Sequence, residues 1–227
     1  MRAISHALAV LCLFVGLPCV TPAGEPLVAL YGHTDAVHTV AVTAHGLTAV
    51  TGSSDNTVKL WRLSDGALLR TLTGHTSLVR SVAIAPHDQT IVSGSADKTI
   101  GVWRVSDGEL LRTLAGHTGQ VRSIAISPDG QTIVSGSSDN LVKVWRLSDG
   151  ELLRTLAGHT GFVQGVAITP DGETIVSAAS DGARAWRLSD GQLVGTLTTM
   201  SCQSVAVAND GRTVVLGGVD YATSKPA

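Results

Sequence analysis

The chain has 227 residues and a formal net charge of -2, and 15% of its residues are charged. This length is enough for one sizeable hydrophobic core or for one array of repeats. The low charge argues against a disordered acidic polymer, and against a protein that binds nucleic acid through its electrostatic field.

The first two dozen residues are typical of a secretory signal peptide. Arg2 precedes an apolar run over 7–17, and a small-residue segment over 20–23 follows Pro18. A basic start, an apolar run of about 7–15 residues and a small-residue exit make up that pattern. The run is shorter than the roughly 20 residues that cross a bilayer. We expect residues 1–23 to be cleaved and the product to be secreted or periplasmic and free of the membrane; an uncleaved anchor is the alternative.

Cysteine usage agrees with this division of the chain. Two of the three cysteines, Cys12 and Cys19, lie in the predicted signal, so Cys202 is the one that stays after cleavage. A single thiol forms no internal disulfide, and packing and hydrogen bonds must hold the core together. We expect Cys202 to be a small core residue rather than a reactive thiol.

Beyond the signal, the chain repeats itself. Gly-His pairs recur at intervals of about 42 residues. Each unit contains four runs of strand-forming residues separated by turns, and in the third unit these runs cover 121–127, 131–137, 141–147 and 151–158. Asp-Gly between such runs is a strong hairpin signal. Four strands joined by tight turns make one antiparallel sheet, which needs neighbouring sheets to bury its faces.

This pattern resembles the WD40 repeat family. Each unit has Gly-His near its start, a turn similar to Ser-Gly-Ser-x-Asp and a Trp that closes the third run, although Arg follows Trp where the family often has Asp. The resemblance covers nearly the whole chain after the signal. It implies an all-β fold, a β-propeller of the WD40 type with four complete four-stranded blades and a partial fifth over 24–223. Residues 224–227 would form a C-terminal tail.

Each unit also contains a His, a hydroxyl residue, an Asp and a Trp, a set that invites comparison with a Ser-His-Asp hydrolase. The resemblance instead implies a structural hydrogen-bond chain from the indole through the hydroxyl and the imidazole to the carboxylate. A catalytic triad is needed once, not once per repeat, and no G-x-S-x-G motif surrounds these serines. The expected tetrads are His33, Thr51, Asp55 and Trp61; His75, Ser93, Asp97 and Trp103; His117, Ser135, Asp139 and Trp145; and His159, Ser177, Asp181 and Trp186.

The repeat decays towards both ends. The fourth unit lacks one residue before Trp186, and the partial fifth covers 202–207 and 213–216 with Leu216 at the hydroxyl position. At the other end, 26–31 is similar to the last strand of a blade, and the resemblance suggests that it closes the ring outside the strands of 202–223. With five blades at most against about seven in the family, three outcomes stay open: a small ring, an open arc, or an arc that self-association or another partner completes.

The resemblance implies that one rim of the propeller binds partners, through positions three and five after each repeat His. Arg80 and Arg122 would be neighbours there, and Arg pairs suit carboxylates. Phe162 is the only Phe outside the signal. We hypothesise a protein partner with an acidic or C-terminal peptide segment; solvated arginines and a half-buried Phe are the alternative. The candidate partner-binding residues are His38, Leu78, Arg80, Gln120, Arg122, Phe162 and Gln164.

We therefore expect an exported, non-catalytic protein-protein interaction scaffold. One alternative is a hydrolase or lyase that uses the central channel of the propeller, and another is a truncated relic of a longer WD40 protein. The innermost strands carry small apolar residues (VAV, VAI, IAI), which disfavours an enzyme. No spacing of His, Cys and Asp suggests a metal site and no phosphate-binding loop is present, so no cofactor, metal or nucleic acid is expected.

Overall fold

The computed structural model describes residues 29–218, and all of its elements are β-strands. The predicted signal peptide, with Cys12 and Cys19, and the predicted tail lie outside the described residues. Within 29–218, no helix is of a length and hydropathy that would let it span a membrane. The predicted all-β fold is confirmed.

Four antiparallel sheets of four strands and one sheet of two strands follow one another along the chain. Their strands are β1 (Val37–Val42), β2 (Thr48–Ser53), β3 (Val58–Arg62) and β4 (Leu68–Leu72); β5 (Val79–Ile84), β6 (Thr90–Ser95), β7 (Ile100–Arg104) and β8 (Leu110–Leu114); β9 (Val121–Ile126), β10 (Thr132–Ser137), β11 (Val142–Arg146) and β12 (Leu152–Leu156); β13 (Val163–Ile168), β14 (Thr174–Ala179), β15 (Gly182–Arg187) and β16 (Leu193–Thr198); and β17 (Cys202–Val207) and β18 (Val214–Gly218).

The turns of each sheet use residues that tolerate a left-handed backbone. Gly130, in the turn between β9 and β10, has φ of 70°, and Asn140, between β10 and β11, has φ of 68°. Gly and Asn adopt this conformation at little cost, which favours the tight connections of a meander of strands. The turn residues of the sequence therefore define where each strand ends.

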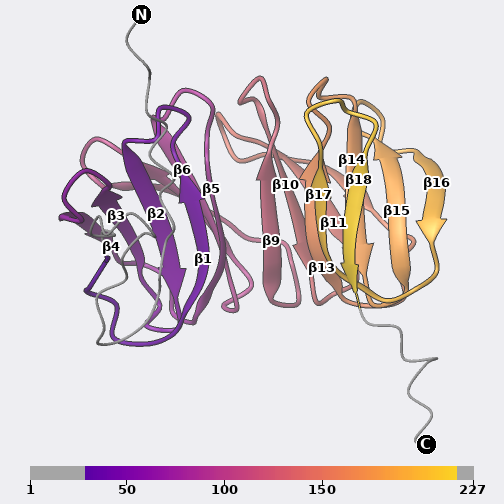
Figure 1. Cartoon of the computed structure of the whole chain (residues 1–227). Coiled ribbons are helices and arrows are strands. Elements are labelled where there is room, and N and C mark those ends of the chain that lie inside the picture. Colours follow the sequence, from indigo (N-terminus) through magenta and orange to yellow (C-terminus); the bar gives the residue numbers. More distant parts are fainter. Residues whose placement is uncertain (1–28, 219–227) are drawn as a thin grey trace, which may run out of the picture.

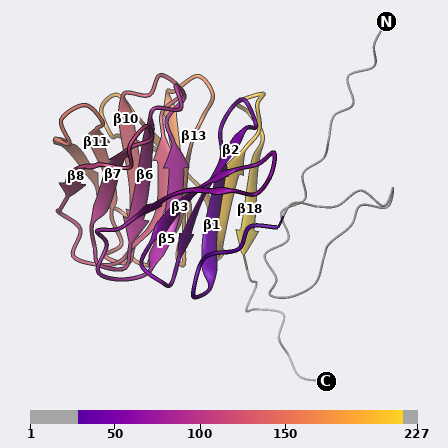
Figure 2. The same ribbon diagram turned by 90° about the vertical axis from the view of Figure 1, so that its left-hand side faces the viewer.

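The sheets stand side by side along a curved array (Figure 1). The innermost strands β1, β5, β9, β13 and β17 pack on one another in chain order. Figure 2 shows β1 and β18 at one side of the molecule and β8 and β11 at the other. Within the described residues no strand of the first sheet pairs with a strand of the last, so these sheets are the two ends of the array.

The expected closing strand over 26–31 is wrong in its described part, because residues 29–31 form no strand. In each complete sheet the fourth strand pairs with the third, as β4 does with β3. Within the described residues the last sheet consists of β17 and β18 alone. The described part of that sheet therefore contains no third strand with which a closing fourth strand could pair.

The hydrophobic core lies between consecutive sheets. We call the face of a sheet that meets the next sheet along the chain its leading face, and the opposite face its trailing face. Between the first two sheets, a leading face meets a trailing face through buried apolar side chains: Val50, Val58, Leu60 and Leu72 against Val79, Val82, Ile91 and Trp103. Equivalent residues form the next two interfaces. Burying one such side chain contributes about 1.5–3 kcal/mol.

A glycine on the leading face of each of the first three sheets sets how closely two sheets approach. A Cβ atom placed at Gly52 would lie 2.5 Å from Cγ1 of Val79. Gly94 and Gly136 stand in the same relation to Val121 and Val163, at 2.7 and 2.6 Å. Side chains larger than hydrogen are therefore excluded where these valines pack.

The interface between the fourth and fifth sheets changes both partners at once. Ala178 takes the place of the glycine, and Cys202 takes the place of the valine; both are buried in one cluster with Ala183. A larger residue on one sheet is thus matched by a smaller one on the next. Burial raises the pKa of the Cys202 thiol, which favours its unreactive protonated form.

We predict that Gly136→Ala lowers the free energy of unfolding by about 1–3 kcal/mol, because its methyl group would overlap Val163. Adding Val163→Cys to Gly136→Ala should recover part of the lost stability, because the double variant has the alanine-cysteine pair that Ala178 and Cys202 form at the fourth interface. Urea denaturation followed by tryptophan fluorescence measures both effects. Gly195→Ala is the control, because no atom lies within 4 Å of its added carbon. Equal effects of Gly136→Ala and the control would contradict the packing argument.

Candidate functional site

The four predicted tetrads are assembled in the same way in all four complete sheets. The Trp Nε1–H donates to the hydroxyl oxygen over 2.7–2.9 Å. The hydroxyl lies 2.7–2.8 Å from the His Nε2. The His Nδ1 lies 2.7–2.8 Å from an Asp carboxylate oxygen. Each tetrad therefore connects an indole to a carboxylate through two bridging groups.

The donors and acceptors of this hydrogen-bond chain favour one protonation state of the imidazole. Because indole N–H is only a donor, the hydroxyl accepts from Trp, and it can give its own hydrogen to His Nε2. His Nδ1–H then donates to the carboxylate. A neutral imidazole satisfies every group. With a protonated imidazole the hydroxyl would receive hydrogens from both the indole and Nε2, and it would have to donate its own hydrogen to another acceptor. The network thus favours neutral histidines.

The titration behaviour of the groups follows from burial and these bonds. Burial lowers the pKa of His33, His117 and His159 below 6.5, although the neighbouring aspartates oppose the shift. Burial alone would raise the pKa of Asp139, but hydrogen bonds from His117 and the Thr118 amide outweigh it and lower that pKa. The stable state of the tetrad combines neutral His with ionised Asp.

Each tetrad fastens the loop before the innermost strand to the rest of its sheet. In the third unit, His117 lies before β9, Ser135 on β10, Asp139 in the following turn and Trp145 on β11. The Asp139 carboxylate also accepts a hydrogen bond from the Thr118 amide at 2.9 Å. The tetrad therefore holds the position of the loop that carries Gln120 and leads into β9, which carries Arg122.

Burial of the hydroxyl groups argues against catalysis. Ser93, Ser135 and Ser177 are 0% exposed, and Thr51 is 1% exposed. A nucleophile must reach its substrate, and these oxygens are covered and already engaged by Trp and His. The arrangement is that of a structural network repeated once per sheet.

The fourth tetrad contains a member that sequence reasoning missed. Arg184 on β15 donates to Asp181 over 2.9 Å and also contacts His159. Its equivalents in the first and third sheets are Lys59 and Lys143, which donate to threonines of the neighbouring strand instead. The missing residue before Trp186, with Gly182 at φ of 124°, marks the altered turn that brings Arg184 to the carboxylate.

The predicted rim residues form contacts that cross from one sheet to the next. Arg80 donates to Gln120 over 3.3 Å, and Arg122 donates to Gln164 over 3.0 Å. Arg122 also donates from Nε to Ser138 over 2.5 Å, and its guanidinium lies 5.4 Å from the centre of the Phe162 ring. The second, third and fourth units are therefore linked along this rim.

The electrostatics of the rim are dominated by two adjacent guanidiniums. Burial and the positive charge of Arg80 together lower the pKa of Arg122. Within the described residues, the buried Nε of Arg80 has no hydrogen-bond partner. Two further candidates extend the surface at its ends: His38 bonds to Ser54 at 2.6 Å, and Phe162 is 48% exposed. Leu78 is partly buried in the loop before β5.

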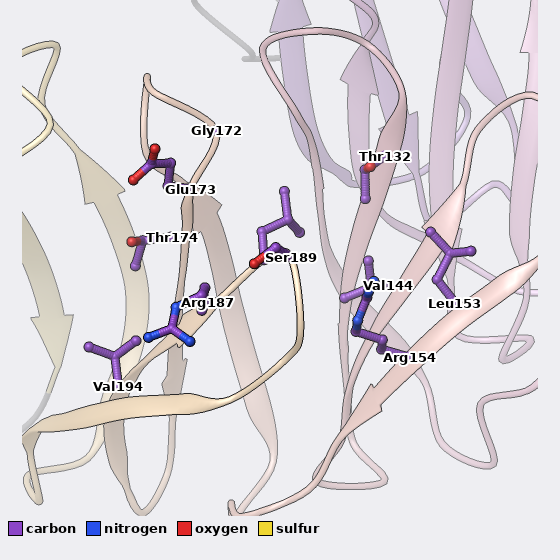
Figure 3. A pocket seen from close by; sticks show the side chains of 11 residues that line it. Thr132, Val144, Leu153, Arg154, Gly172, Glu173, Thr174, Arg187, Ser189 and Val194 are labelled. Carbon is purple, nitrogen blue, oxygen red and sulfur yellow. The ribbon is translucent and has the colours of Figure 1, made fainter.

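A groove of about 670 Å³ lies between the third and fourth sheets. In Figure 3, Val144 and Leu153 stand on one side of it, and Arg187 and Val194 stand on the other. A smaller groove recurs between the second and third sheets, with Val102 and Leu111 at the positions of Val144 and Leu153. The groove is thus a repeated feature of the joints between sheets. The residues that the structure describes contain no cluster of three metal-ligating side chains.

We predict that Ser135→Ala lowers the free energy of unfolding by about 1–3 kcal/mol, because the Trp145 indole and the His117 imidazole lose their shared partner inside the protein. Ser135→Thr should have little effect, because Thr51 fills the same role in the first unit. Chemical denaturation of the two variants measures the difference. Equal stability of the alanine and threonine variants would contradict the bridging role of the hydroxyl.

Stability should decrease as the pH falls from 7 towards 5. In the unfolded chain His33, His117 and His159 take up protons below about pH 6.5, whereas their lowered pKa keeps them neutral in the fold. The unfolded state then binds more protons, so the free energy of unfolding falls. The lowered pKa of Asp139 adds a further loss near pH 4. Urea midpoints at pH 7.5, 6.5 and 5.5 test this; a constant or rising midpoint towards acid would contradict it.

A family profile described as "WD domain, G-beta repeat" matches residues 24–62, 66–104, 108–146 and 150–183. These segments make up more than half of the chain, and each of them ends in the third strand of a sheet or at its start. No curated protein matches the chain. WD40 repeats generally mediate protein-protein interactions, and proteins built from them are typically non-enzymatic. The repeated sheets and the family match agree, and the chain belongs to the WD40 repeat family.

Proposed function

We propose that this protein is an exported, non-catalytic scaffold that binds an acidic or C-terminal segment of a partner protein on the rim formed by Arg80, Arg122 and Phe162. The observation that carries the proposal is the pair of arginines on adjacent sheets, held by glutamines of the following units. Together they present two positive charges beside an exposed aromatic ring.

The chemistry of the rim suits a carboxylate. Two close guanidiniums repel each other, and a bound carboxylate relieves that repulsion while it accepts charge-assisted hydrogen bonds. The exposed Phe162 ring beside Arg122 offers an apolar anchor, and Arg and aromatic residues are enriched among binding hot spots.

Two further parts of the proposal rest on separate observations. The covered tetrad hydroxyls and the apolar innermost strands support a non-catalytic role. The basic start, apolar run and small-residue exit of 1–23 support export and cleavage after Ala23. Finding Gly24 as the first residue of the protein outside the cytoplasm would support export, and full-length protein confined to the cytoplasm would contradict it.

We expect Arg80→Ala together with Arg122→Ala to weaken binding of an acidic peptide at least tenfold, because charge-assisted hydrogen bonds contribute about 1.5–3 kcal/mol each. The probe is a fluorescent ten-residue peptide with four acidic residues before a free carboxyl end, and anisotropy measures its affinity. The same peptide with amide side chains and an amidated end should bind weakly to the unaltered protein.

The matched control is Arg112→Ala with Arg154→Ala, which removes the same charge from the outer strands β8 and β12. It should leave the peptide affinity within about twofold, as long-range effects of exposed charges are screened by salt. Equal loss in both double variants, or no preference for the acidic peptide, would refute binding at the rim.

A further inference from the structure

We propose that the two ends of the arc bind each other between copies of this chain, so that the leading face of the β17–β18 sheet in one copy packs on the trailing face of the β1–β4 sheet in the next. The joint would repeat the contact that already connects consecutive sheets within one chain. This inference concerns the end faces and is independent of peptide binding on the rim.

Each end face exposes a valine whose equivalents are buried at the first three interfaces between sheets. On the trailing face of the first sheet Val40 is 42% exposed, whereas its equivalents Val82 and Ile124 are each 7% exposed. On the leading face of the last sheet Val215 is 61% exposed, whereas its equivalent Val176 is 2% exposed. At Val40 and Val215, each end thus exposes part of an interface that is closed elsewhere in the same chain.

The two halves are complementary at the glycine-valine contact. The pairing of Ser204 with Gly217 matches that of Thr39 with Gly52, so Gly217 stands at the glycine position of a leading face. The preceding interface uses Ala178 and Cys202 instead. The leading face of the last sheet therefore has a glycine at this position, as the first three sheets do, and in those sheets the glycine leaves room for a valine. Val37, at the start of β1, is the valine at the matching position of the first trailing face.

A hydrogen bond across the internal interfaces provides a second match. The Val82 amide donates to Thr39 over 3.2 Å, and the Ile124 amide donates to Ser81 over 3.0 Å. The Val166 amide donates to Ser123 in the same way, over 3.1 Å. At the fourth interface Gly165 occupies the hydroxyl position, so the bond is lost there.

The last sheet again has a hydroxyl residue at this position. Ser204 occupies the position of Thr39, Ser81 and Ser123, as its pairing with Gly217 shows, and it is exposed. The amide that corresponds to those of Val82 and Ile124 is that of Val40, on the first sheet. A joint between copies would therefore restore both the hydroxyl-amide bond and the glycine-valine contact that the fourth interface lacks.

The end faces carry little that would keep copies apart. Strands β17 and β18 contain no charged residue that would repel a second apolar face. His38 is the only titratable residue of β1, and it bonds to Ser54 of its own sheet. A contact between two different faces is heterologous, and it produces a closed ring if the rotation per copy closes and a filament if it does not.

The test uses light scattering on the purified protein from about 1 to 100 µM, with Val40→Glu and Val215→Glu. The unaltered protein should have a mass of at least two chains at the upper concentrations. Each variant alone should have the mass of one chain, since every joint needs one intact face of each kind. An equimolar mixture of the two variants should form a species of two chains, because one intact face of each kind remains.

Leu152→Glu is the matched control, since Leu152 is 40% exposed but lies on the outer strand β12 in the middle of the arc. It should associate like the unaltered protein. Unfolding midpoints confirm that the variants are folded, and Val40→Thr with Val215→Thr replaces any glutamate variant that is not. A single-chain mass for the unaltered protein at every concentration would overturn the inference. Association of either variant alone, or a mixture that stays at one chain, would overturn it too.

Discussion

This structure depends on the need of each sheet to cover its apolar faces with neighbouring sheets. A four-stranded antiparallel sheet has two apolar faces and cannot bury both by itself. The chain meets this constraint by repeating one interface, in which a leading-face glycine such as Gly94 accepts a valine such as Val121. The near-identity of the units follows from it, because each sheet must present one face to its predecessor and the other to its successor. The exposed ends of the arc are its direct consequence.

Stability within a sheet and stability between sheets come from different residues. The tetrads connect loop, strands and turn inside one unit through a neutral imidazole and an ionised carboxylate. The interfaces between units are almost entirely apolar. Rim residues such as Gln120 and Phe162 lie outside the tetrads and outside these apolar clusters, although Gln120 accepts a hydrogen bond from Arg80 of the preceding unit. This separation leaves the rim available for binding.

The sequence predicted what is local or periodic. The runs at 121–127 and 131–137 correspond to β9 and β10, because turn residues limit a strand on both sides. The residues of each tetrad could be named because their spacing is constant from unit to unit. What depends on neighbours in space was not predicted: the contact of Arg184 with Asp181 follows from one missing residue and an altered turn. The strand expected over 26–31 failed because pairing needs a third strand that the described part of the last sheet does not contain.

Hydrogen exchange, followed strand by strand by mass spectrometry, tests most directly whether neighbouring sheets stabilise one another. At about 1 µM we expect slow exchange in β9–β11, which are covered on both faces, and faster exchange in β1 and in β17–β18, which are covered on one face. At higher concentration, protection should rise at those end strands and stay constant in the middle. Uniform protection at every concentration would mean that each sheet is stable without its neighbours, and would contradict the account.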